Sequence, residues 1–236
     1  MRDRLLASPI LTSLGIPHGF SIRAGGVSSG IFESLNFGNP SDLPRDQRDP
    51  YTNIRANIER LLSDLRCTGR ETVEVHQVHS AHVHVVSPGQ PAHPGEHDTK
   101  ADAIITADPS RILMIRVADC APILLADAEG PLVAAVHAGW RGVVSGVLPE
   151  TIRRMRALGA RNLAAAVGPC ISVDHFEVGD EVVAEFHLAF PNADSLIRRE
   201  PGAKAHIDLK QALATQLRAA GIVRFDILPH CTHGDA

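Results

Sequence analysis

One stretch decides the fold: residues 116–142 read RVADCAPILLADAEGPLVAAVHAGWRG. The apolar run Ile123–Ala126 and the apolar run that begins at Val133 flank a polar turn at residues 127–130, which predicts an antiparallel hairpin. Cys120 and His137 both lie away from that turn. The hairpin therefore places a thiol and an imidazole at the same end of the ladder, although the two residues are separated in sequence.

The rest of the chain sets the class of protein. The length of 236 residues and the 44% hydrophobic content fit one domain over 1–236. A formal charge of −4 and the lack of a long Lys/Arg run argue against a nucleic-acid or membrane-surface partner, so a small molecule fits better. No signal-peptide or membrane-spanning pattern is present, and we expect a cytoplasmic protein with reduced thiols, since its four cysteines are far apart.

Periodicity gives the remaining elements. Apolar runs of strand length occur at residues 101–106, 112–117, 163–167 and 222–228, and the first two read as strands buried on both faces. Helical spacing of apolar residues occurs at residues 54–65, 143–158, 182–190 and 209–217. We expect Pro149 to kink or restart the second helix, Asp208 to cap the last one and Gly221 to end it. The result is a mixed α/β fold, a layered sandwich with a central mixed sheet.

The thiol and imidazole of the hairpin invite three interpretations. One cysteine and two histidines form a typical zinc donor set, and His76 or His79 would supply the third ligand. A neighbouring cysteine and histidine can instead be a nucleophile and its base, or two unreactive core residues. The spacing matches no local zinc motif, so the residues alone leave all three open.

Five motifs follow one another along the chain: residues 76–79 (HQVH), 101–106 (ADAIIT), 118–122 (ADCAP), 137–142 (HAGWRG), and 168–171 (GPCI) with 176–178 (FEV). Together they resemble the YfiH family, also called the laccase-domain or polyphenol-oxidase-like family, over about residues 18–233. In that family the histidine of the first motif, the cysteine after the aspartate and the histidine before Ala-Gly-Trp bind zinc. The resemblance thus implies a YfiH-like fold and zinc ligands at His79, Cys120 and His137, with His79 on an earlier strand and with copper as the less favoured metal.

The resemblance also implies an activity. Family members are purine nucleoside phosphorylases acting on adenosine, inosine and methylthioadenosine, with adenosine deaminase activity. Phosphorolysis needs a cationic phosphate site, for which Arg141 and Arg23, beside a glycine-rich turn, are candidates, the alternative for each being a salt bridge. We place Gln77 with these substrate-binding residues.

Two carboxylates are candidates for acid/base catalysis or purine recognition. Asp119 precedes the metal cysteine and could alternatively orient a metal ligand. Asp102 interrupts an apolar strand and is either a turn cap or a site residue. With Arg141, these two form the expected catalytic set.

Three rival functions remain. A multicopper laccase needs many His-x-His pairs, and this chain has only His82-Val83-His84. A peptidoglycan-precursor editing hydrolase would use Cys120 and His137 as a dyad, and a binding protein would use zinc structurally. Family members usually continue beyond Cys231-Thr232 into an aromatic and arginine-rich tail, whereas this sequence stops at Ala236. If that tail is absent from the protein, the phosphate or substrate contacts that it would make are absent with it.

Overall fold

The computed structural model describes residues 4–40, 43–90 and 99–235. The chain packs into two compact units, Met1–Arg70 and Glu71–Ala236, and each is described here by itself. That the two units form one domain stays a prediction. Among the described residues, no helix combines the length and the apolar character needed to cross a membrane.

The first unit is small and rich in loops. Its elements are β1 (Leu5–Leu6), α1 (Pro9–Ser13), β2 (Phe20–Ser21), the 3-10 turns η1 (Gly30–Phe32) and η2 (Arg45–Gln47), and α2 (Tyr51–Asp64). Helix α2 confirms the amphipathic helix predicted there, and it buries Ile54 and Leu62. It also buries Asn57, whose Oδ1 accepts a hydrogen bond from the backbone N–H of Val27 at 2.9 Å. A buried polar side chain thus holds the backbone of the glycine-rich turn.

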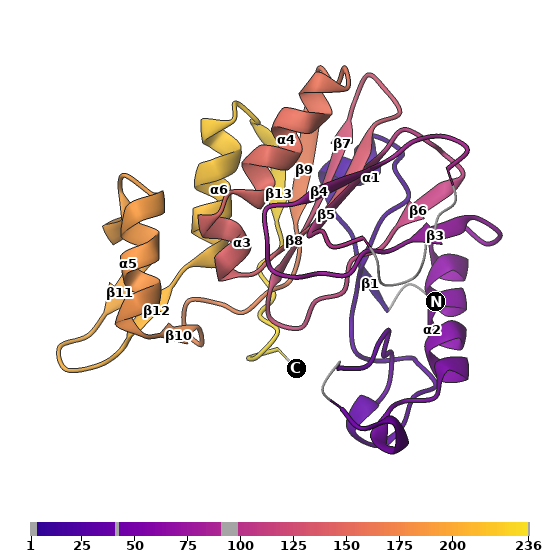
Figure 1. Ribbon diagram of the computed structural model, residues 1–236, viewed down its shortest axis with the longest axis horizontal. Helices are drawn as coiled ribbons and strands as arrows, with labels where there is room; N and C mark the ends of the chain where they lie inside the picture. Colours follow the sequence, from indigo (N-terminus) through magenta and orange to yellow (C-terminus); the bar gives the residue numbers. More distant parts are fainter. Residues whose placement is uncertain (1–3, 41–42, 91–98, 236) are drawn as a thin grey trace. The chain divides into compact units, whose positions relative to one another are not determined.

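A six-stranded sheet forms the centre of the second unit (Figure 1). Its strands are β4 (Val83–Val86), β5 (Ala103–Thr106), β7 (Ala121–Asp127), β8 (Val133–Ala138), β9 (Leu163–Val167) and β13 (Arg224–Ile227). They lie in the order β13-β9-β7-β8-β5-β4, with the two outermost pairs parallel and the inner pairs antiparallel. The predicted mixed α/β fold with a central mixed sheet is confirmed.

The predicted hairpin lies in the middle of that sheet. Strands β7 and β8 pair antiparallel from Ala126↔Val133 at the turn to Ala121↔Ala138 at the open end. Pro122 lies directly opposite His137, and Cys120 precedes the first residue of β7. The predicted hairpin is therefore confirmed, and its register brings the thiol and the imidazole to one end.

The other elements of the second unit surround the sheet. They are β3 (Glu71–Val73), β6 (Arg111–Leu113), α3 (Trp140–Val144), α4 (Val147–Ala157), β10 (Glu177–Val178), α5 (Asp180–Ala189), η3 (Ala193–Leu196), β11 (Ile197–Arg199), β12 (Ala205–Ile207) and α6 (Leu209–Ala219). Strands β3 and β6 pair parallel, and β10, β12 and β11 form a three-stranded sheet. Most apolar side chains of these elements join one large core.

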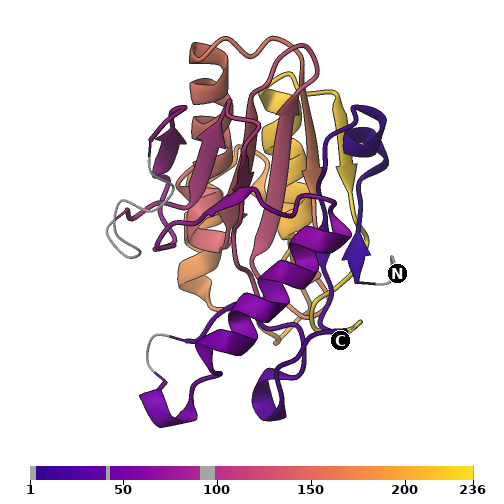
Figure 2. The same ribbon diagram turned by 90° about the vertical axis from the view of Figure 1, so that its right-hand side faces the viewer.

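Both faces of the sheet are covered. Ile105 and the buried faces of α4 and α6 belong to the main core, and Figure 2 shows these two helices behind the strands. Ile104, which precedes Ile105 on β5, points to the opposite face and packs with Val73 and Val75. This two-sided burial explains why the strands read as continuous apolar runs.

Two expectations differ from the structure. The second of the predicted buried strands is only β6, Arg111–Leu113, which is half-buried and pairs with β3 alone; the residues from Met114 to Cys120 form a loop. The helical stretch after His137 restarts, as predicted, but the break lies before Pro149: α3 ends at Val144, and α4 begins at Val147 after Gly146, which has φ 79°. Pro149 lies in the first turn of α4, where its missing N–H costs no helical hydrogen bond.

The cap of α6 gives the first testable prediction. Asp208 accepts a hydrogen bond from the backbone N–H of Gln211 at 2.8 Å, and Gly221 follows the helix with φ 73°. Asp208→Ala leaves that N–H without its partner, and we expect the free energy of unfolding to fall by about 1 kcal/mol. Urea denaturation measures the change. Gln211→Ala is the matched control, because only the backbone of Gln211 takes part in the cap; equal losses in the two variants would contradict the assignment.

Candidate metal centre

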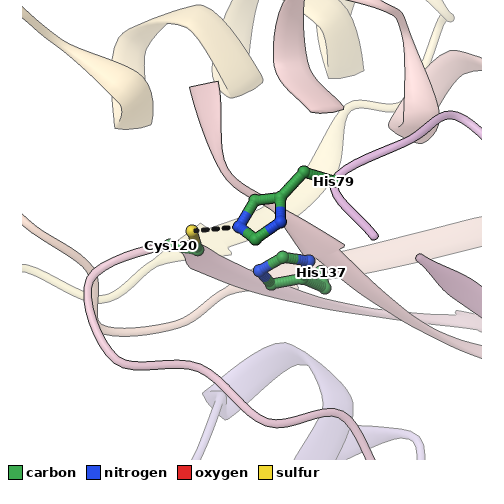
Figure 3. A group of neighbouring side chains, drawn as sticks. All are labelled: His79, Cys120 and His137. Atoms are coloured by element: carbon green, nitrogen blue, oxygen red, sulfur yellow. Dashed lines mark hydrogen bonds between the residues drawn. The ribbon is translucent and has the colours of Figure 1, made fainter. Parts of the chain in front are cut away.

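Three side chains meet at the open end of the hairpin (Figure 3). The ligand atoms of His79, Cys120 and His137 all lie within 4.8 Å of one another. The Sγ of Cys120 is 3.8 Å from Nε2 of His79, and the two imidazole rings are 4.8 Å apart at an interplanar angle of 78°. The structure therefore brings together the three residues that the family resemblance implied as ligands.

The backbone supplies these residues in three different ways. Cys120 ends the loop before β7, and His137 lies within β8. His79 was expected on a strand, which is wrong: it lies in the loop between β3 and β4 and has φ 59°. A residue in the left-handed region cannot continue a strand. His76 lies outside the cluster and forms an isolated bridge with Lys100.

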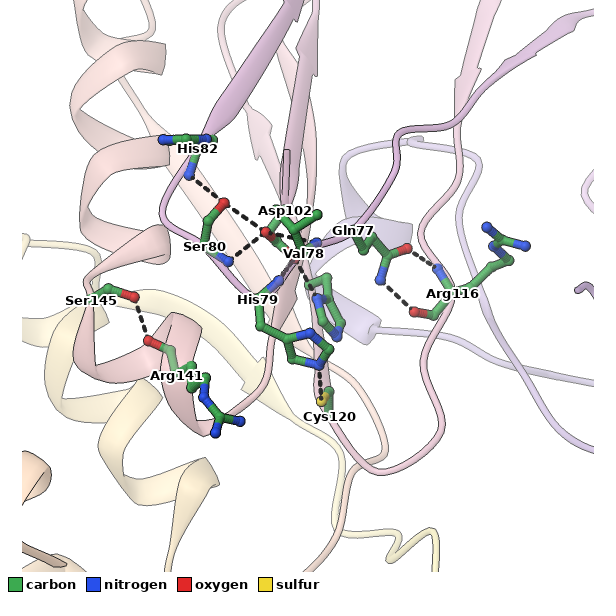
Figure 4. Close-up of polar contacts among 11 residues, drawn as sticks. Gln77, Val78, His79, Ser80, His82, Asp102, Arg116, Cys120, Arg141 and Ser145 are labelled. Atoms are coloured by element: carbon green, nitrogen blue, oxygen red, sulfur yellow. Dashed lines mark hydrogen bonds and ion pairs between the residues drawn. The ribbon is translucent and has the colours of Figure 1, made fainter. Parts of the chain in front are cut away.

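A single carboxylate organises that loop (Figure 4). Asp102 is fully buried and accepts hydrogen bonds from the backbone N–H groups of Val78 at 3.3 Å, His79 at 2.9 Å and Ser80 at 2.6 Å. The hydroxyl of Ser80 donates to it at 2.8 Å, and Nδ1 of His137 lies 2.9 Å from it. Asp102 is thus hydrogen-bonded both to the loop that carries His79 and to the His137 side chain.

These contacts fix the ionisation of Asp102 and His137. Burial alone would raise the pKa of Asp102, but the hydrogen bonds from Ser80, His137 and His79 hold it below its usual value. Burial lowers the pKa of His137, although the hydrogen bond to Asp102 opposes that shift. An anionic carboxylate beside a neutral imidazole favours the tautomer in which Nδ1 carries the proton and Nε2 is left to bind a metal.

Cys120 differs from an activated nucleophile. Burial, followed by the charges of Asp119 and Asp102, raises the pKa of its thiol to about 11. Without a metal the thiol is therefore protonated at neutral pH. A bound divalent cation would reverse this, because metal coordination deprotonates a thiol.

Gly139 makes space for the cluster. A Cβ atom at this position would lie 2.7 Å from Sγ of Cys120 and 3.0 Å from Cδ2 of His79. Any side chain would displace two of the three ligands, so the HAGWRG motif needs its glycine for steric reasons.

Of the other predicted residues, Arg141 and Asp119 lie next to the centre in sequence and are exposed. The guanidinium of Arg141 stacks over the ring of Trp140 at 4.3 Å. One carboxylate oxygen of Asp119 accepts a hydrogen bond from Thr232 Oγ1 at 2.7 Å. Neither side chain is locked in an ion pair among the interactions that the structure gives it.

Gln77 and Arg23 have other partners. The side-chain amide of Gln77 donates to the carbonyl oxygen of Arg116 at 2.7 Å and accepts from its N–H at 2.8 Å. Arg23 belongs to the first unit, is exposed, and donates through Nε to the carbonyl oxygen of Glu33 at 2.6 Å. Gln77 therefore holds the backbone of Arg116 in place. Arg23 uses its Nε in the bond to Glu33, and its role as a phosphate ligand stays a prediction.

Sequence reasoning missed Ser80, Gly139 and Thr232. Ser80 directly follows His79, and a hydroxyl at such a loop position is a signal for a local hydrogen bond. Gly139 was part of a quoted motif, yet its close approach depends on tertiary packing. Thr232 lies 113 residues from Asp119, so no local pattern could pair them.

The donor set fits a zinc ion. Zinc takes thiolate sulfur at about 2.3 Å and imidazole nitrogen at about 2.0–2.1 Å, so tetrahedral ligand atoms lie roughly 3.3–3.6 Å apart. The Sγ of Cys120 and Nε2 of His79 are 3.8 Å apart, and all three donor atoms lie within 4.8 Å of one another. Three protein ligands on one side leave a position for water or substrate. Within the described residues this is the one group of three or more His, Cys, Asp or Glu side chains that could hold a metal ion.

The chain is similar to curated enzymes and to a solved structure. The chain is 37% identical to a purine nucleoside phosphorylase of Deinococcus radiodurans over 92% of this chain and 79% of that protein. It is 40% identical to adenosine deaminase RL5, from an unknown prokaryotic organism, over 56% of this chain and 52% of that protein. The crystal structure of the Bacillus licheniformis hypothetical protein YfiH superposes with a TM-score of 0.80 at 25% identity, covering 91% of this chain and 82% of that one.

A family model also matches nearly the whole chain. It is described as multi-copper polyphenol oxidoreductase laccase, and the match spans residues 17–236. The chain therefore belongs to this laccase-like family, with YfiH among its structural neighbours.

Proposed function

We propose that this protein is a zinc-dependent purine nucleoside phosphorylase that acts on adenosine, inosine and methylthioadenosine and also deaminates adenosine. The observation that carries the proposal is the convergence of His79, Cys120 and His137 in a chain whose relatives are named for these activities. Phosphorolysis transfers the ribosyl group from the purine to phosphate, and deamination replaces the purine amino group by water. Both reactions place developing charge where a cation can stabilise it.

The ligands would have distinct tasks. Cys120, His79 and His137 would hold the zinc ion, and Asp102 would keep the Nδ1 proton on His137 so that Nε2 faces the ion. The ion would supply Lewis-acid charge at the exposed side of the cluster. Because Asp102 is fully buried and already accepts five hydrogen-bond contacts, we assign it to positioning rather than to proton transfer.

Asp119 is the better candidate for the proton-transfer group. It is exposed, and the Thr232 hydroxyl donates a hydrogen bond to only one of its carboxylate oxygens. It directly precedes Cys120, so a substrate near the metal would lie within reach of its carboxylate. A carboxylate in this position can accept a proton from water or return one to the purine.

Arg141 is the proposed phosphate ligand. It follows Gly139, which lies against two of the metal ligands, and its guanidinium is exposed. Planar guanidinium groups bind phosphate oxygens in a bidentate way. Gln77 would act on substrate binding through the Arg116 segment that it holds, and Arg23 stays a predicted phosphate ligand.

Two alternatives fit less well. A hydrolase dyad of Cys120 and His137 would need an activated thiol, yet burial raises the pKa of Cys120 to about 11 and its thiol lies against His79. Activity on a UDP-muramyl substrate that survives full metal removal would favour the dyad. A copper polyphenol oxidase would need several copper sites, while a single thiolate with two imidazoles also suits zinc.

Product analysis tests the activity. Zinc-loaded protein incubated with adenosine and phosphate should form adenine in a phosphate-dependent reaction, and inosine without phosphate. Cys120→Ala removes the thiolate ligand, and we expect turnover to fall by about 100-fold or more. Cys67→Ala, which alters a cysteine of the first unit, is the control and should keep its activity. Absence of all three products adenine, inosine and hypoxanthine from the wild type would refute the proposal.

Replacing each aspartate by asparagine distinguishes the proposed roles of Asp102 and Asp119. Asp102→Asn places an amide group where N–H donors converge, and we expect zinc affinity to fall by about 10–100-fold. Asp119→Asn should leave zinc affinity near the wild-type value and lower kcat by about 100-fold or more. Chelator competition and steady-state kinetics measure the two effects. The assignment is wrong if Asp119→Asn loses zinc or Asp102→Asn keeps it.

The thiol of Cys120 makes zinc binding depend on pH. Its pKa of about 11 means that the metal-free thiol is protonated at neutral pH, so each bound ion displaces one proton. Between about pH 7 and about pH 8.5, zinc affinity should rise about tenfold per pH unit, because His137 is already neutral there. Competition with a chromophoric chelator gives the slope. In Cys120→Ala the slope should flatten, and a pH-independent wild type would contradict a thiolate ligand.

A further inference from the structure

Two cysteines outside the metal centre face each other. Cys170 follows β9 and Cys231 follows β13, the parallel pair at one edge of the sheet. The two residues form an isolated parallel bridge, and the backbone N–H of Thr232 donates to the carbonyl oxygen of Cys170 at 3.3 Å. Both thiols are free.

This pairing suits a disulfide. Neighbouring parallel segments lie about 4.7–4.9 Å apart, and disulfides join Cα atoms separated by about 4.4–6.8 Å. Directly paired residues also project their side chains to the same face. Linking Cys170 to Cys231 therefore needs side-chain rotation more than backbone movement.

The environment of Cys231 favours a negatively charged sulfur. Its Sγ accepts hydrogen bonds from the backbone N–H groups of Ser172 and Gly234, both at 3.3 Å, and lies 3.4 Å from Nδ1 of His175. The ring of His175 is itself stacked on that of His233 at 4.5 Å. Burial would raise the pKa of the Cys231 thiol, but the hydrogen bonds from Ser172, Gly234 and His233 lower it to about 6.

Cys170 has the opposite character. It is fully buried, whereas Cys231 keeps 9% of its surface exposed. Burial raises the pKa of the Cys170 thiol to about 12. A small oxidant would thus meet a reactive thiolate first, with a protonated thiol paired beside it.

We propose that Cys170 and Cys231 form a peroxide-responsive thiol pair, in which Cys231 is oxidised first and Cys170 then closes a disulfide with it. The oxidant is a hydroperoxide, with hydrogen peroxide as the simplest member. The pair is separate from the zinc ligands, and the proposal does not depend on the nucleoside reaction.

The two steps balance. The Cys231 thiolate attacks one peroxide oxygen, the O–O bond breaks, hydroxide leaves, and Cys231 becomes a sulfenic acid. The Cys170 sulfur then attacks the Cys231 sulfur, the S–O bond breaks, and the departing hydroxide takes the Cys170 proton as water. The cysteines lose two electrons in total, and the peroxide gains them.

The pair is connected to the metal centre through Asp119. The residue after each cysteine bonds to it: Ile171 N–H donates to its carbonyl oxygen at 3.0 Å, and Thr232 Oγ1 donates to its carboxylate at 2.7 Å. Asp119 directly precedes Cys120. Closing the disulfide would pull on both contacts, so we infer that oxidation weakens metal binding by Cys120.

Disulfide mapping tests the pair on the full-length, zinc-loaded protein. After treatment with one equivalent of hydrogen peroxide and blocking with N-ethylmaleimide, mass spectrometry should find a peptide linking Cys170 to Cys231, which dithiothreitol removes. In Cys170→Ala, dimedone should trap a sulfenic acid at Cys231 about tenfold faster than at the buried Cys67. In Cys231→Ser, residue Cys170 should stay reduced.

If a variant does not fold, measurements on the wild-type protein are enough to refute the proposal. A Cys231 that remains open to N-ethylmaleimide after peroxide treatment, or a disulfide that involves Cys120, would refute the thiol pair. The connection to the metal has its own measurement: transfer of zinc to a chelator should become about tenfold faster on oxidation in the wild type and stay unchanged in Cys170→Ala. Equal acceleration in both proteins would mean that peroxide attacks Cys120 directly.

Discussion

The carboxylate of Asp102 is the interaction on which the candidate site depends. It is fully buried, and an unpaired buried charge would be costly, so its oxygens must be satisfied by nearby donors. Those donors are the backbone of residues 78–80, the Ser80 hydroxyl and Nδ1 of His137. The same bonds that satisfy the charge hold His79 at a positive φ and fix the tautomer of His137. One buried anion thereby holds two candidate metal ligands, His79 and His137, that lie far apart in the sequence.

The sheet determines the third ligand. Antiparallel pairing of β7 and β8 sets Pro122 opposite His137, and Cys120 lies two residues before Pro122, beyond the last pair of the ladder. A slip of one residue would turn His137 to the other face of the sheet. Ile123 and Val136 are paired and fully buried. They oppose that slip, because it would turn buried side chains away from the core in which they pack. Core packing therefore maintains the arrangement of the Cys120 and His137 side chains as well as the fold.

The sequence allowed a good prediction of the fold and a partial prediction of the site. The hairpin, the helix cap at Asp208 and the central strands depend on local patterns of apolar residues and turns, and these survive in the structure. The strand expected for His79 failed because Asp102 offers the loop N–H groups a better partner than a strand would, and a contact across 23 residues leaves no local pattern. Likewise β6 is short, since only β3 pairs with it. Burial of Asp102 itself could be anticipated from its place in an apolar run, but not its partners.

The loop that carries Cys120 is held on both sides, and this changes the meaning of Gln77. Its side-chain amide makes both of its hydrogen bonds with the backbone of Arg116, four residues before Cys120. On the other side, Ile171 and Thr232 bind Asp119. The residues between Leu113 and Ala121 belong to no strand, so they have no strand-to-strand hydrogen bonds to hold them. The contacts of Gln77, Ile171 and Thr232 take that role and limit how far the Cys120 thiol can move. The Gln77 side chain therefore holds the backbone of the Cys120 loop, two residues before His79 of the cluster, and its role toward substrate stays a prediction.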